Sequence, residues 1–206
     1  MDFLNLEQEY ARKGFFAVAG VDEVGRGPLA GPVVCAAVIL PLEEEKRIVG
    51  IDDSKKLSAR KREILAEEIK KTARAYAIEE VGEDVIDEIN ILQATRLCMK
   101  RAVENLRPNA DMVLTDGNMT LDISLPQRSI VKGDALVASI GAASILAKTY
   151  RDALMRKYDE LYPEYGFARN AGYGTKEHIE AIGRIGICKI HRRTFITKFW
   201  DGRERN

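Results

Sequence analysis

The stretch FFAVAGVDEVGRGPLAGPVVCAAVIL, residues 15–40, contains two apolar runs joined by a glycine-rich segment. The β-branched and aromatic residues of these runs predict one strand over 15–22 and a second over 32–40. The segment between them, GRGPLAG at 25–31, has the form of a dinucleotide-binding fingerprint. That fingerprint must open a helix, whereas a proline and a second β-branched run follow here. The stretch therefore predicts two strands with a glycine loop between them, and not a nucleotide-binding turn.

Beyond these strands, helical and strand patterns alternate along the chain. Strands are expected over 76–81, 112–116 and 127–132, and helices over 58–71, 90–106, 134–158 and 175–184. Ser58 is the expected N-cap of the first of these helices. Read as βββαβαβ with trailing helices, the order predicts an α/β fold in which a mixed five-stranded sheet is flanked by helices.

Length and charge indicate how the chain is organised. Its 206 residues, 46% of them hydrophobic, predict one main domain over 1–160 and a C-terminal helical, basic extension over 161–206. Residues 169–206 hold nine Lys and Arg against four Asp and Glu, and the rest of the chain holds 23 against 28. This asymmetry fits either a phosphate-contacting surface or a solvated helix face, and charge alone does not decide between them.

The lack of a recognisable targeting signal and the spacing of the cysteines predict a cytoplasmic protein. The first ten residues carry acids in place of a basic leader, and the longest apolar runs, 33–40 and 135–147, are too short to span a bilayer. Cys35, Cys98 and Cys188 form no CxxC pair and are interpreted as buried, reduced thiols. We expect a cytoplasmic, monomeric protein.

Four carboxylates stand at the ends of predicted elements. Asp22 and Glu23 end the first strand, Asp116 ends the strand over 112–116, and Asp134 opens the long helix. Each has an ordinary explanation when taken alone. Acids are common at solvated strand ends, and an Asp at a helix N-terminus stabilises the helix by about 1 kcal/mol.

Taken together, these four carboxylates predict a metal site. Hard cations prefer oxygen ligands, and a set of four at one edge of a sheet suits two Mg²⁺ or Mn²⁺ ions. Such a site hydrolyses phosphodiesters by in-line displacement and needs no Ser, Cys or His nucleophile. A serine-hydrolase elbow is a poor alternative, because Val137 stands where the first glycine of G-x-S-x-G belongs before Ser139.

Five motifs in this order resemble the ribonuclease HII family, bacterial type. They are GVDEVGRGPLAGPVV (20–34), DSKKLS (53–58), TDGN (115–118), KGDALVASIGAASILAK (132–148) and GYGTKEH (172–178). The resemblance covers about residues 19–195. It implies a ribonuclease H-like fold with a C-terminal helical extension, and it carries the catalytic, metal-binding carboxylates onto Asp22, Glu23, Asp116 and Asp134.

The resemblance also implies an activity. An endoribonuclease of this family would hydrolyse the RNA strand of RNA/DNA hybrids and incise duplex DNA 5′ to an embedded ribonucleotide, leaving a 5′ phosphate and a 3′ hydroxyl. Two alternatives are a related metal-dependent DNA nuclease of the same fold and a non-catalytic hybrid-binding module, against which the intact carboxylates argue. The ending TKFWDGRERN lacks a QxxxLxxFF-like sliding-clamp peptide, so clamp binding is not part of the prediction.

Two groups of residues are implied in substrate binding. The Gly25-Arg26-Gly27 segment is implied to approach the ribose 2′-hydroxyl through its backbone, which glycine permits, and Tyr173 to sense the junction between ribonucleotide and deoxyribonucleotide. The DSKKLS stretch resembles the family's phosphate-contacting loop, or it is a turn before a helix. Its candidate contacts are Ser54, Lys55 and Lys56.

Other basic residues leave two interpretations open. Lys148 and Arg151 lie about one turn apart on the long predicted helix, and His191, Arg192 and Arg193 follow one another in the basic C-terminal region. Each of them either contacts phosphate or has a structural role.

Overall fold

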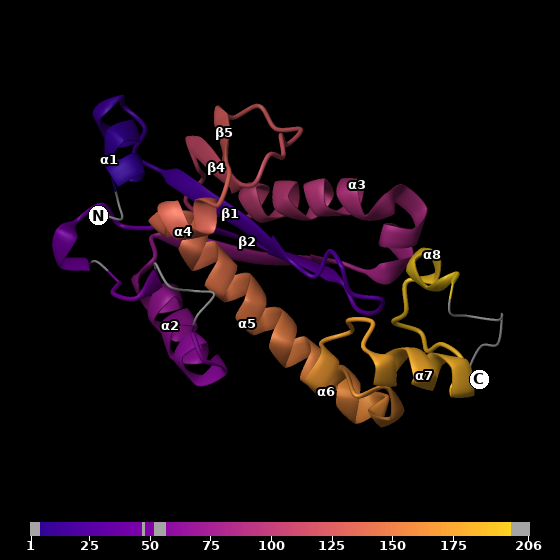
Figure 1. Ribbon diagram of the computed structural model, residues 1–206. Coiled ribbons are helices and arrows are strands. Elements are labelled where there is room, and N and C mark those ends of the chain that lie inside the picture. The colour runs from indigo at the N-terminus through magenta and orange to yellow at the C-terminus, as the bar shows by residue number, and fades with distance from the viewer. Residues whose placement is uncertain (1–4, 47, 52–56, 199–206) are drawn as a thin grey trace.

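A mixed five-stranded sheet forms the centre of the molecule, as predicted (Figure 1). The computed structural model describes residues 5–46, 48–51 and 57–198. The strands run in the order β3-β2-β1-β4-β5. They are β1 (Val18–Val24), β2 (Val33–Ile39), β3 (Ala75–Val81), β4 (Met112–Asp116) and β5 (Gln127–Ile130). The central strand β1 pairs antiparallel with β2 and parallel with β4, so two parallel strands lie side by side in the interior of the sheet.

Ten helical segments have both of their ends in the described ranges. They are α1 (Asn5–Arg12), η1 (Glu44–Lys46), α2 (Ala59–Thr72), α3 (Glu83–Glu104), α4 (Gly133–Leu136), α5 (Ala138–Leu161), η3 (Pro163–Tyr165), α6 (Phe167–Asn170), α7 (Lys176–Ile185) and α8 (Arg193–Ile196). No helix within these ranges is long and apolar enough to cross a membrane.

Helices cover both faces of the sheet. All seven residues of β2 are buried, and they alternate between two cores. Val33, Cys35 and Ala37 belong to the core under α3, whereas Val34 and Ala36 belong to the core under α2 and α5. Figure 1 shows α3 and α5 on opposite sides of the sheet. This double burial explains why β2 is apolar at every position and does not alternate with polar residues.

Small residues allow α5 to lie close against the central strand. An added Cβ at Gly20 of β1 would stand 2.2 Å from the backbone nitrogen of Ile140. No side chain fits in that space, so glycine is required at this position. The Ala, Gly and Ser residues in the first half of α5 have the corresponding effect on the helix side of the contact.

The strands and main helices fall in the predicted ranges, but the summary order βββαβαβ does not describe them. Helix α2 lies between β2 and β3, and β4 leads into β5 without an intervening helix. The short helix α1 was not predicted. Helix α3 begins at Glu83, and Asn90 interrupts it with φ 66°. The Asn90 side chain accepts hydrogen bonds from the amides of Leu92 and Gln93, so it caps the segment that was predicted to begin there.

The C-terminal helices pack around a core of their own. Phe167, Ile182 and Ile196 are buried there together with Leu29 of the glycine loop and Met155 of α5. Backbone hydrogen bonds join the two parts: the Leu29 amide donates to the Gly172 carbonyl, and Gly31 donates to the carbonyl of Ile190. The glycine loop is therefore held between the sheet and the C-terminal helices. The three cysteines are buried, as expected.

Candidate active site

Asp22 and Asp116 meet at one edge of the sheet because their strands are parallel neighbours. Val21 of β1 pairs with Thr115 of β4, and each is followed directly by one of the two carboxylates. Asp22 and Glu23 do not end their strand as predicted, because β1 continues to Val24. This edge opens into a pocket of about 310 Å³. Its lining contains all four predicted carboxylates, Asp22, Glu23, Asp116 and Asp134, together with Val24, Arg62, Ser144, Ile145 and Lys148.

Asp134 reaches this pocket from a helix of one turn. Val137 has an extended conformation (φ −132°, ψ 120°), so it separates α4 from α5, and the long helix does not begin at Asp134 as predicted. The Gly133 amide, just before Asp134, donates a 2.6 Å hydrogen bond to Asp116 Oδ1. This bond ties the start of α4 to the end of β4 and brings Asp134 beside Asp116.

The carboxyl groups of β1 lie in an environment that disfavours negative charge. Burial raises the pKa of Asp22 to about 8, and the charges of Glu23 and Asp116 add to this effect. Burial also raises the pKa of Glu23, although Arg26, whose Nη1 lies 3.4 Å from Glu23 Oε1, partly opposes it. Glu23 Oε2 is buried and accepts no hydrogen bond within the described part of the chain. A divalent cation bound beside these groups would favour their charged forms.

The donor set fits hard cations, but it is not drawn together as a finished metal centre. Among the described residues, no three Asp, Glu, His or Cys side chains converge closely enough to hold a metal ion. The four side chains offer only oxygen ligands, which Mg²⁺ and Mn²⁺ prefer.

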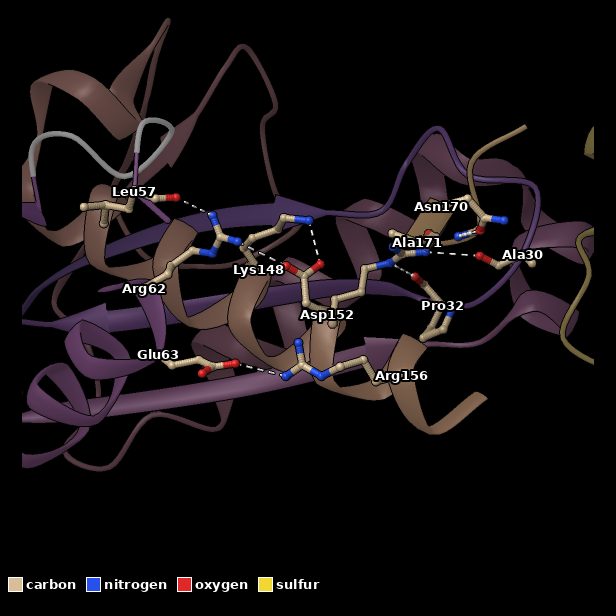
Figure 2. Close-up of polar contacts among 12 residues, drawn as sticks. Ala30, Pro32, Leu57, Arg62, Glu63, Lys148, Asp152, Arg156, Asn170 and Ala171 are labelled. Atoms are coloured by element: carbon tan, nitrogen blue, oxygen red, sulfur yellow. Dashed lines mark hydrogen bonds and ion pairs between the residues drawn. The ribbon is translucent and has the colours of Figure 1, made fainter. Parts of the chain in front are cut away.

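Two cations line the same pocket as the carboxylates. Figure 2 shows both of them, Arg62 and Lys148, directed at Asp152. Arg62 of α2 and Lys148 of α5 both bind Asp152, with Nη2 and Nζ lying 3.3 and 2.6 Å from its two carboxylate oxygens. Asp152 thus holds two positive groups at the rim of an acidic pocket, where they can meet a phosphate. Arg62 could not be identified from the sequence, because nothing near it indicates that α2 packs on α5.

The glycine loop and Tyr173 lie side by side. An added Cβ at Gly27 would stand 3.5 Å from Cε1 of Tyr173, and the Tyr173 side chain is about half exposed. Gly25 has φ +93°, and an added Cβ there would stand 2.3 Å from Nε of Arg151. A residue with a side chain is therefore excluded at Gly25 by both conformation and space.

The structure decides between the two interpretations for most of the other basic residues. Arg151 and Arg192 are fully buried and bind backbone carbonyls, so they do not form a phosphate-contacting surface. His191 is buried against His178. Arg193 is exposed. Ser54, Lys55 and Lys56 fall outside the described residues, and their role stays a prediction.

The fold and the pocket define an α/β protein of the ribonuclease H-like class. The sequence profile described as ribonuclease HII matches residues 19–198. The chain is 54% identical to ribonuclease HII of Endomicrobium trichonymphae over 195 residues, which is 94% of this chain and 92% of that protein. It is also 54% identical to ribonuclease HII of Enterococcus faecalis over 189 residues, covering 92% and 73% of the two chains.

Solved structures agree with this assignment. Ribonuclease H2 from Pyrococcus horikoshii superposes with a TM-score of 0.73 at 29% identity, covering 86% of this chain and 92% of that one. RNase HII from Archaeoglobus fulgidus, solved in complex with PCNA, gives a TM-score of 0.75 at 28% identity, with 87% and 94% covered. The chain therefore belongs to the ribonuclease HII family, and it is a ribonuclease H enzyme, an endoribonuclease.

Proposed function

We propose that this endoribonuclease hydrolyses the RNA strand of RNA/DNA hybrids and incises duplex DNA 5′ to a single embedded ribonucleotide, leaving a 5′ phosphate and a 3′ hydroxyl. The observation that carries the proposal is that Asp22, Glu23, Asp116 and Asp134 line one pocket. Membership of the ribonuclease HII family supports it. The family resemblance of the sequence motifs supplies the cleavage position and the product ends.

The four carboxylates would hold two divalent cations, Mg²⁺ or Mn²⁺. When bound, such ions supply the charge stabilisation needed for in-line displacement at phosphorus. Asp22 and Glu23 approach from β1, Asp116 from β4 and Asp134 from α4, so the ligands would surround the ions from three separate elements. Glu23 Oε2, buried without a hydrogen-bond donor among the described residues, is a ready ligand atom.

The chain's own cations would position the substrate backbone. Arg62 and Lys148 line the pocket from α2 and α5, and Asp152 fixes both of their side chains. Phosphate contacts of this kind orient a nucleic acid strand without reading its sequence. They would place the scissile phosphate over the carboxylates.

The sugar would be read at the other side of the pocket. Arg26 joins the two regions, because its side chain pairs with Glu23 while its backbone belongs to the glycine loop. A single 2′-hydroxyl distinguishes ribose from deoxyribose, so recognition requires hydrogen-bonding groups very close to the sugar. The backbone of Gly25-Arg26-Gly27 can approach that closely, and the exposed ring of Tyr173 beside Gly27 can stack on the next sugar.

Three labelled duplexes test the proposal. One is all DNA, one carries a single ribonucleotide, and one is an RNA/DNA hybrid, each incubated with Mg²⁺, Mn²⁺ or EDTA. We expect cleavage of the second and third only, in the presence of metal, with a 3′ hydroxyl on the upstream product. Cleavage of the all-DNA duplex would favour a DNA nuclease of the same fold, and binding without cleavage would favour a hybrid-binding module.

Some features of the family are not part of the proposal. The archaeal relative was solved in complex with PCNA, and no clamp binding is proposed for this chain. The cytoplasmic location and the monomeric state stay predictions from the sequence.

A further inference from the structure

Arg192 is a buried cation whose guanidinium donates hydrogen bonds to three backbone carbonyls of the glycine loop. Its guanidinium donates to the Gly25 carbonyl at 2.6 Å, to the Arg26 carbonyl at 3.0 Å and to the Gly31 carbonyl at 2.7 and 2.9 Å. Its side chain is fully buried, and the guanidinium lies over the ring of Phe195, 5.2 Å from the ring centroid. A fork of fixed donors that spans three carbonyls is a geometry that arginine provides and lysine does not.

These bonds fix the direction of two amide groups. In a trans peptide the C=O and N–H of one peptide unit point in opposite directions. The cis bond between Arg107 and Pro108 is elsewhere, so both peptides of this segment are trans. Because Arg192 draws the Gly25 carbonyl toward itself, the Arg26 N–H points away from it. Arg192 also holds the Arg26 carbonyl. Because this carbonyl and the Gly27 N–H belong to one peptide unit, the Gly27 N–H points away from Arg192 as well.

The two amides have no other partner in the described structure. Neither the Arg26 N–H nor the Gly27 N–H donates a hydrogen bond to another described residue, whereas the Leu29 and Gly31 amides of the same loop are paired with the C-terminal region. Gly27 borders the exposed ring of Tyr173. Two unpaired donors therefore lie beside the residue that is implied in reading the sugar.

We propose that Arg192 is a positioning residue for sugar recognition: by binding the Gly25 and Arg26 carbonyls, it orients the Arg26 and Gly27 amides toward the ribose 2′-hydroxyl. This inference rests on the proposed function. It assigns to Arg192 the role of holding the Gly25-Arg26-Gly27 backbone in the conformation that binds the sugar. Arg192 does not touch the substrate. It acts through the backbone, and the free amides donate to the hydroxyl oxygen.

Arg151 provides a matched control within the same loop. It is also a fully buried arginine, and it also binds carbonyls only, those of Ala30, Pro32 and Ala171. None of these carbonyls belongs to the two peptides that carry the Arg26 and Gly27 amides. Replacing Arg151 should therefore weaken the packing of the loop about as much as replacing Arg192, while leaving the direction of the two amides unchanged.

The experiment compares ribose preference in three proteins. Fluorescence anisotropy gives Kd for a duplex with one ribonucleotide and for the matching all-DNA duplex, with Ca²⁺ present and cleavage checked on gels. We expect wild type and Arg151→Lys to prefer the ribonucleotide duplex about tenfold, which corresponds to one or two hydrogen bonds to a hydroxyl. Arg192→Lys should lower this preference to less than about threefold, with an unchanged Kd for all-DNA duplex.

Each outcome has a separate meaning. A folded Arg192→Lys protein that keeps the wild-type preference would overturn the inference, and so would an Arg151→Lys protein that loses the preference equally. No preference in wild type would overturn the proposed sugar reading itself, and with it the role of Arg192. Melting curves report whether each variant is folded.

A second measurement does not depend on a stable Arg192 variant. In wild-type protein labelled with ¹⁵N-glycine, the Gly27 amide signal should shift when the ribonucleotide duplex binds and should shift much less with the all-DNA duplex. Equal shifts with both duplexes, or no shift with either, would contradict the inference. Gly183, an exposed glycine of α7 with open space around it, serves as the internal reference signal.

Discussion

The Nε2 atoms of His178 and His191 lie 3.0 Å apart in the core of the C-terminal helices. His178 Nδ1 lies 2.9 Å from the Tyr173 carbonyl, which can only accept a hydrogen bond, so that nitrogen carries the proton. His178 Nε2 then accepts from His191 Nε2, and His191 Nδ1 accepts from the Cys188 amide at 2.9 Å. One neutral tautomer of each ring satisfies the whole chain of bonds, which holds the backbone of Tyr173 in place.

This histidine pair predicts a loss of stability in acid. Burial lowers the pKa of His191 from 6.5 to about 3, with a contribution from His178. Between these values the unfolded chain binds a proton that the folded chain does not, so the free energy of unfolding falls as the pH falls below 6.5. The loss from His191 should reach about 3 kcal/mol near pH 4.5. Urea unfolding at pH 7.5 and 4.5 measures it.

His191→Gln provides the comparison for that measurement. Glutamine keeps a donor toward His178 but does not titrate, so the variant should lose less stability than wild type between the two pH values. Titration of the carboxylates is common to both proteins and cancels in the difference. Equal losses in wild type and variant would show that His191 is not held neutral.

Tyr173→Ala should lose far more activity on a single-ribonucleotide duplex than Tyr173→Phe. The ring beside Gly27 can stack on a sugar, and phenylalanine keeps that ring, whereas alanine removes it. We expect a loss of about a hundredfold or more in kcat/KM for Tyr173→Ala, corresponding to roughly 3 kcal/mol. Tyr76→Ala on β3, with a side chain of similar exposure, is the control. Small and equal losses in both Tyr173 variants would leave Tyr173 as a loop anchor.

Asp22→Asn should make the metal-free protein more stable. Burial and the charges of Glu23 and Asp116 raise the pKa of Asp22 from 3.8 to about 8. The stability that this raised pKa represents is fully present below pH 3.8 and is lost as the pH rises through 8. In EDTA at pH 9 the variant should therefore melt a few degrees above wild type. This corresponds to a free energy of unfolding that is higher by about 1 kcal/mol.

With Mn²⁺ present, wild type should melt at a higher temperature than Asp22→Asn. Added ions should raise the melting temperature of wild type and have much less effect on Asp22→Asn, because the variant lacks one ligand. A variant that melts below wild type in EDTA at pH 9 would contradict the account of repelling, buried carboxylates.

Removing the chain after Lys198 should raise KM and leave kcat unchanged. Residues 199–206 hold two arginines, Arg203 and Arg205, together with Asp201 and Glu204. Contacts of arginine with phosphate contribute affinity without touching the scissile bond. The truncation cannot begin at residue 196, because Ile196 is completely buried in the C-terminal core. A folded truncated protein with a tenfold lower kcat, and with unchanged KM and salt dependence, would show that the charge asymmetry has another origin.

The carboxylates could be predicted from the sequence, whereas the buried arginines could not. Asp22 and Asp116 each follow an apolar run that predicts an interior strand, and carboxyl ends of parallel strands meet at one edge. Arg151 and Arg192 could be read only as two cations, because a sequence shows charge and not burial. The carbonyls that satisfy them belong to residues 119 or more positions earlier for most of these bonds.

Breaks in the helical backbone also could not be predicted from the sequence pattern. Val137 is apolar and lies within a periodic run, so the prediction carried one helix through it, yet the chain is extended there. Because of this break, Asp134 belongs to the separate helix α4, from which it lines the pocket. Helix α1 carries Glu7, which is buried and accepts a hydrogen bond from the Ser139 amide at the start of α5. That contact spans 132 residues and has no local signal.

The turnover of Asp116→Asn tests the central claim most directly. The claim is that the carboxylates gathered at the ends of β1 and β4 hold the metal ions that carry cleavage at a ribonucleotide. Single-turnover cleavage of a duplex with one ribonucleotide should be measured in Mg²⁺ for wild type, Asp116→Asn and Asp22→Asn, with folding checked by melting in EDTA. We expect both variants to fold and to cleave at less than about a hundredth of the wild-type rate. A folded variant that cleaves faster than that would contradict the assignment of these carboxylates as the metal-binding catalytic site.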